Sequence, residues 1–180
     1  MRARSFAILV AATCLTLSAC GGDEGPGTVK LYDRAPVPGV PDRTAVIDPS
    51  MTTLAPDGEY WSDLLGGTDG DNPTITFLLT QALFADACTD TLGADACADD
   101  YGVIEDPHAT VIVVQADIGS VTVVAQTRQN FAVTPQELYI LAGGGPPNDS
   151  APDGFVYVPF PFLLSVRDGK IVQAHQIWVP

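Results

Sequence analysis

The sequence predicts an α+β fold: a small, mainly antiparallel sheet rolled into an open barrel, with two short helices. Short runs of aromatic and β-branched residues alternate with clusters of glycine, asparagine and aspartate, which is typical of strands joined by turns. Two stretches without helix breakers favour helices, and one of them has a complete start signal. The chain has 180 residues, of which 46% are hydrophobic, so a single domain has enough apolar side chains for a core.

The first twenty residues carry the features of an export signal in order. Two arginines precede a nearly all-apolar run from Phe6 to Leu17, which is too short to cross a hydrocarbon layer of about 30 Å as a helix. Small residues then lead to Cys20. This order resembles the lipobox of bacterial lipoproteins, which implies cleavage of a signal peptide at residues 1–19 and a lipid on Cys20. The alternative is an ordinary secretory signal cut near Ala19, with Cys20 as a spare thiol.

The lipobox resemblance implies a protein held on the extracytoplasmic face of the bacterial cell membrane, with the membrane itself as a partner. Residues 20–56 are expected to be the lipidated cysteine and a flexible tether, because they are rich in proline and glycine and show no sustained periodicity. Within the tether, residues 28–32 and 44–47 are candidates for a short strand added to the domain. A single α+β domain is expected over residues 57–180.

The first half of that domain is predicted as strands with one helix between them. Aromatic and β-branched residues mark the strands, and a turn rich in glycine and aspartate separates the first two. The last two are expected to form a hairpin through residues 116–119. The expected elements are strands at 59–65 and 74–79, a helix at 80–87, and strands at 110–115 and 121–126.

The second helix has the clearest local signal. Thr134 fits the N-cap position, Pro135 fits the first turn, and Glu137 fits the reciprocal position of a capping box. The run of glycine and proline at residues 143–147 is expected to end this helix.

The C-terminal segment predicts a hairpin around an Asp-Gly turn at residues 168–169. A two-residue turn with regular pairing places Phe162 opposite His175. Pro161 has no N–H to donate, so the ladder is expected to fail there and to free residues 176–178 for another strand. The order of elements is similar to that of OB-like barrels, and this ending resembles those of uncharacterised secreted bacterial proteins. Neither resemblance implies an activity, because small barrels host unrelated functions.

The net charge limits the class of partner, and the spacing of two cysteines indicates a disulfide. The chain has 22 acidic and 8 basic residues and a formal net charge of −14, which argues against nucleic acid as a partner, because binding phosphates needs clustered lysine and arginine. Cys88 and Cys97 are expected to form one disulfide in an oxidising compartment. A redox pair or a zinc site at these cysteines is disfavoured by their spacing and by the lack of a histidine nearby.

A few polar residues are candidates for chemistry. The chain has two histidines; His108 is interpreted as a solvated loop residue, and His175 as either a hydrogen-bonded core or pocket residue or a general base. Asp69 and Asp71 begin like a calcium loop. The twelfth position of that loop is Thr80 and not glutamate, so an EF-hand is excluded, and the default interpretation is a solvated turn.

Aromatic residues concentrate in the predicted sheet. Most of them are expected in the core, and where one sheet face lacks helix cover they are expected to line a groove or partner surface. The residues proposed for this binding surface are Tyr60, Trp61, Tyr101, Tyr157, Phe160, Phe162, His175 and Trp178.

The sequence thus favours a binding or assembly module of the cell envelope over an enzyme. Its partner is expected to be an envelope protein or a small ligand, and no cofactor is expected other than calcium. Two alternatives stay open: a small envelope hydrolase that uses His175 with carboxylates, and a calcium-stabilised structural module.

Overall fold

The structure is a computed structural model that describes residues 30–54, 56–97 and 99–179. These residues form an eight-stranded sheet in the order β1-β6-β5-β8-β7-β2-β3-β4, in which β5 and β8 are parallel and the other neighbours antiparallel. The strands are β1 (Arg34–Ala35), β2 (Gly58–Thr68), β3 (Thr74–Phe84), β4 (Tyr101–Val114), β5 (Ile118–Val124), β6 (Asn130–Val133), β7 (Phe162–Arg167) and β8 (Lys170–Gln176). The helices are α1 (Ala85–Leu92) and α2 (Pro135–Ala142), with 3-10 turns η1 (Ala94–Cys97) and η2 (Gln115–Asp117).

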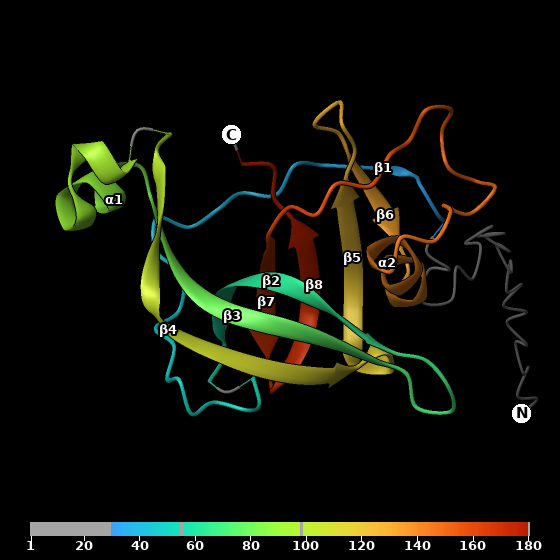
Figure 1. Cartoon of the computed structure of the whole chain (residues 1–180), viewed down its shortest axis with the longest axis horizontal. Helices are drawn as coiled ribbons and strands as arrows, with labels where there is room; N and C mark the ends of the chain where they lie inside the picture. The colour runs from blue at the N-terminus through green and yellow to red at the C-terminus, as the bar shows by residue number, and fades with distance from the viewer. Residues whose placement is uncertain (1–29, 55, 98, 180) are drawn as a thin grey trace, which may run out of the picture.

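The predicted α+β class, with a mainly antiparallel sheet and two short helices, is confirmed. The sheet is not closed into a barrel, because β1 and β4 stand at its two ends without pairing to each other. Strand β2 bends the sheet: residues 58–62 pair with β7, and residues 61–68 pair with β3. As a result β3 and β4 cross over β7, β8 and β5 in Figure 1. The main core fills the space between these parts, with side chains such as Phe77 and Leu164 meeting there.

Two predicted elements are wrong, and in both cases long-range pairing overrides a local preference. The expected helix at 80–87 is a strand as far as Phe84, because residues 81–84 pair with β4, and α1 begins only at Ala85. The expected hairpin through residues 116–119 does not form, because β5 pairs in parallel with β8 and antiparallel with β6.

Helix α2 begins as predicted, but its capping box does not close. The Thr134 hydroxyl accepts a hydrogen bond from the Glu137 amide at 3.1 Å, as an N-cap should. The buried Glu137 carboxylate instead accepts hydrogen bonds from the Tyr32 hydroxyl and, at 2.8 Å, from the Asn148 amide. Burial, followed by the bond to Glu137, raises the pKa of Tyr32. One carboxylate therefore ties α2 to the segment before β1 and to the loop after the helix.

The described part of the expected tether packs on the domain. Tyr32, Ile47 and Leu54 are buried, and β1 pairs with β6. Residues 1–29, which contain the expected signal peptide and Cys20, lie outside the described residues. Among those described, no helix has the length and apolar character needed to cross a membrane.

Candidate functional site

A one-residue shift in the terminal hairpin decides where His175 lies. The predicted turn at residues 168–169 forms with positive φ at both residues, as a two-residue hairpin turn requires. The register then shifts, so that Leu163 lies opposite His175, and the predicted pairing of Phe162 with His175 is wrong by one residue. Such a shift marks a β-bulge, in which one strand carries an extra residue.

The bulge moves His175 from the core face to the outer face of the sheet. Opposite residues share a face, and Phe162 is fully buried in the main core. The extra residue lets Ile171 and Ala174 both point inward, where both are buried. Regular pairing would instead have turned the Gln173 amide into the core, at a cost of about 1–3 kcal/mol if unpaired. The bulge therefore keeps the polar residues of β8 on the outside.

A groove of about 530 Å³ lies on this outer face, a volume within the range of small-ligand sites. One wall is the proline-rich segment 36–41, which follows β1 and crosses the sheet (Figure 1). Strands β2, β7 and β8 form the floor. The floor residues are Glu59, Leu163, Ser165, Gln173 and His175.

Glu59 carries the charge of the groove floor. Its carboxylate accepts a hydrogen bond from the Ser165 hydroxyl at 2.5 Å. The Arg167 guanidinium lies 3.2 Å from the other carboxylate oxygen, and the Arg167 side chain is 52% exposed, so solvent weakens this ion pair. The Ser165 hydroxyl proton is thus held by Glu59, while lone pairs of both residues stay available to a ligand.

His175 is held by a chain of polar residues. Its Nδ1 lies 2.8 Å from the Thr122 hydroxyl, which accepts a hydrogen bond from the Asn130 amide at 3.2 Å. Burial lowers the pKa of His175, although the Glu59 carboxylate opposes that shift. The imidazole is therefore neutral at pH 7, and its Nε2 is the ring nitrogen left for a ligand.

The depressed pKa of His175 predicts a pH dependence of stability. An unfolded histidine binds a proton near pH 6.5, whereas folded His175 resists protonation until the pH is lower. The free energy of unfolding should therefore fall as the pH is lowered below about 6.5, and this fall should be smaller in His175→Asn. Urea unfolding of both chains at neutral and acidic pH tests this. If the free energy of unfolding falls equally in the native chain and in His175→Asn, the role given to His175 is contradicted.

The structure separates the aromatic residues that were expected to form one binding surface. Tyr60, Trp61 and Phe162 are at most 1% exposed, so a binding role at these three is corrected to a core role. Tyr101 is half-buried, stacks on Phe84 and lies near Trp61. These ring contacts place Tyr101 in a cluster with Trp61 and Phe84, away from the groove.

Tyr157, Phe160 and Trp178 are half-buried and lie outside the groove lining. Tyr157 forms an isolated bridge with Ala125, the residue after β5, and burial raises the pKa of Tyr157 to about 12. The Arg128 guanidinium lies 3.5 Å from the centre of the Trp178 ring, which is a cation–π contact.

Other predicted residues lie apart from the groove. Cys88 and Cys97 form the expected disulfide, with Cα atoms 5.9 Å apart. Asp69 and Asp71 are exposed in the β2–β3 turn, and the described residues contain no group of three or more histidine, cysteine or acidic side chains placed to hold a metal ion. The calcium site stays a prediction.

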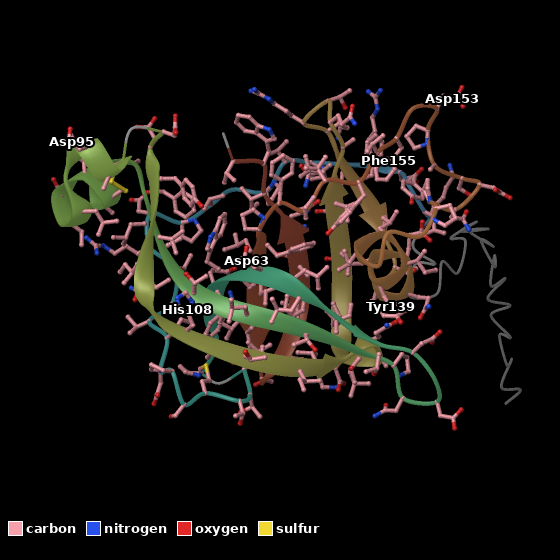
Figure 2. The ribbon with its side chains drawn as sticks, in the orientation of Figure 1. Asp63, Asp95, His108, Tyr139, Asp153 and Phe155 are labelled. Carbon is pink, nitrogen blue, oxygen red and sulfur yellow. A yellow bond between two sulfur atoms is a disulfide. The ribbon has the colours of Figure 1, made fainter. Side chains whose placement is uncertain are left out.

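The second histidine lies beside an acid on the far end of the sheet. His108 on β4 and Asp63 on β2 lie near each other in Figure 2. Burial raises the pKa of Asp63, and His108 opposes that rise. His108 itself is exposed, as predicted, but it lies on strand β4 and not in a loop, so the loop part of that prediction is wrong.

Of the predicted site residues, His175 is the one that lines the groove. Sequence reasoning missed Glu59, Ser165, Gln173 and the wall at 36–41. The structure marks the bulge by two neighbouring residues of β8, Val172 and Gln173, which are both exposed. The sequence offers no signal for it, because Val172 is apolar and does not look like an outward residue.

No known protein family, curated protein or solved structure matches the chain. Its function is therefore inferred from the chemistry of the groove and from the resemblance of residues 1–20 to a lipoprotein signal.

Proposed function

We propose that the protein is a lipid-anchored binding module of the bacterial cell envelope, and that the groove between segment 36–41 and the sheet takes a small polar ligand. The lipobox resemblance at Cys20 supports the location. The groove supports the binding role, because four polar side chains from three strands converge on its floor. That convergence is the observation on which the proposal rests.

The ligand is expected to be a neutral or cationic molecule with several hydrogen-bonding groups. Glu59 and Ser165 offer acceptor lone pairs, Gln173 offers an amide, and His175 offers a ring nitrogen. Leu163 and the prolines of the wall offer apolar contact to carbon atoms. A net charge of −14 and the carboxylate of Glu59 disfavour anions.

Titration with three sugars of matched shape tests the proposal. Glucosamine is cationic, glucose is neutral and glucuronate is anionic at pH 7. Chemical shifts of backbone amides around Glu59 and Gln173 should respond in that order, with glucosamine binding most tightly. His175→Ala should weaken glucosamine binding about tenfold, the worth of one good hydrogen bond. His108→Ala is the matched control and should leave binding unchanged, because His108 lies outside the groove. No response to any sugar, or a preference for glucuronate, would overturn the proposal.

The hydrolase alternative has one observation in its favour, which is that Glu59, Ser165 and His175 line one groove. A serine hydrolase needs its nucleophile hydrogen-bonded to its base. Here the Ser165 hydroxyl donates to Glu59, and Nδ1 of His175 pairs with Thr122. Hydrolysis of p-nitrophenyl acetate that is lost in His175→Ala and kept in His108→Ala would favour the enzyme over the binding module.

A further inference from the structure

The strand at one end of the sheet has a long edge without a partner. Strand β4 pairs with β3 alone in the sheet order, and Figure 1 shows it at the rim. Strand β1 at the other end has two residues. Within the part of the chain that the structure describes, no element other than β3 hydrogen-bonds to residues 108–114.

The register shows which backbone groups of β4 point away from the sheet. The Gln115 amide donates to the Pro73 carbonyl at 2.9 Å, and this contact continues the β3–β4 register by one pair. In an antiparallel ladder, residues alternate between bonding toward the partner and pointing away from it. Residues 109, 111 and 113 therefore bond toward β3, and residues 108, 110, 112 and 114 present their N–H and C=O groups at the free edge.

Over residues 108–114 this edge lacks the features that keep sheet edges apart, whereas Glu105, Asp106 and Pro107 come directly before that segment on the same strand. Natural proteins protect edge strands with lysine, other charges, proline or bulges. Segment 108–114 has the sequence His-Ala-Thr-Val-Ile-Val-Val, with no acidic, basic or proline residue apart from the histidine. Ile112 is 66% exposed. An exposed, β-branched and uncharged edge is a template for pairing with another strand.

We propose that this edge pairs with the same edge of a second copy of the chain, antiparallel across a two-fold axis. With the axis at Val111, Thr110 of one copy lies opposite Ile112 of the other, and the outward backbone groups of the two strands bond to each other. The net charge of −14 makes two copies repel over most of their surface. Segment 108–114 has no carboxylate, so like charges do not meet within it, and Pro107 with the acidic residues 105–106 limits the paired length to this segment. A cationic peptide, by contrast, finds no carboxylate on this segment to bind.

Hydrogen exchange together with sedimentation tests this pairing. The full chain is purified from its cell membrane in detergent, with micelles in excess over protein. It is then measured at protein concentrations below and well above the micromolar range. At the higher concentration, the sedimenting protein mass should double, and the Thr110 and Ile112 amides should exchange at least about tenfold more slowly. The Val111 amide, which bonds to β3, should be protected at both concentrations and reports that β4 is folded.

Two lysine variants locate the contact. Ile112→Lys should abolish the doubling of mass and the slow exchange of Thr110, because it places a charge on the edge. Leu65→Lys is the matched control, since Leu65 is 57% exposed on β2, away from the edge; it should still dimerise. Protection of Thr110 without a change in mass would identify another segment of the same chain as the occupant and overturn the proposal. A monomer with rapid exchange at both concentrations, or a dimer with rapid exchange of Thr110, would overturn it as well.

Discussion

Replacing Gln176 by leucine is expected to destabilise the domain by about 4 kcal/mol. The Gln176 side chain is fully buried; its carbonyl accepts from the Val124 amide at 2.8 Å, and its amide donates to the carbonyls of Val158 at 2.7 Å and Phe160 at 3.0 Å. Leucine has a similar volume but no polar atom. The Val124 amide and the Phe160 carbonyl would therefore lose their partner, at about 1–3 kcal/mol each, while the Val158 carbonyl would keep only its hydrogen bond from the Phe160 amide.

Urea unfolding of the two chains measures this effect. Gln173→Leu is the matched control, because Gln173 is exposed on the same strand and the change should alter stability by less than about 0.5 kcal/mol. A loss below about 1 kcal/mol in Gln176→Leu would show that residues 158–160 find other partners, and would contradict the role given to this side chain.

Removing the disulfide, as Cys88→Ala with Cys97→Ala, is expected to cost about 3 kcal/mol. The bond joins cysteines nine positions apart, and closing a loop of this size in the unfolded chain accounts for most of the cost. Both cysteines are also buried, where they pack with Leu83. The loss of those contacts adds to the cost.

Denaturant unfolding with and without a reducing agent tests the disulfide. The reductant should destabilise the native chain by a similar amount and should leave the double alanine variant unchanged. A native chain whose stability does not respond to the reductant, although free thiols appear, would contradict the stabilising role.

Local signals predicted the elements that depend on neighbouring residues. The Thr134 cap and the turn at 168–169 involve residues within one turn of each other, and both form as predicted. The parallel pairing of β5 with β8 joins residues some fifty positions apart, and no local pattern encodes it. Gly119 lies in the segment 116–119 that was predicted to turn a hairpin. It instead allows a close approach of strands, because a Cβ there would lie 2.4 Å from the Val172 carbonyl oxygen.

The groove was harder to predict than the fold. His175 was identified, but the regular pairing turned it toward Phe162 and the core, whereas the bulge turns it outward. Glu59 lies more than a hundred positions from His175, and only the tertiary structure brings them together. Segment 36–41 was interpreted as part of a tether because its prolines form no helix or strand. In the folded domain Val40 of this segment packs on the sheet and is partly buried, and this contact cannot be read from the sequence.

The most direct test of the binding role is to fill the groove. Gly39 lines it, and a side chain there would meet no atom within 4 Å of its Cβ, so Gly39→Trp adds a large ring to the groove wall without a clash at the Cβ, and we expect that ring to occupy the groove. Val37→Trp is the control, since Val37 is 70% exposed on the same segment and does not line the groove. Titration with glucosamine should show binding lost in Gly39→Trp and kept in Val37→Trp. Equal binding by the two variants would show that the ligand sits elsewhere, and would contradict the account.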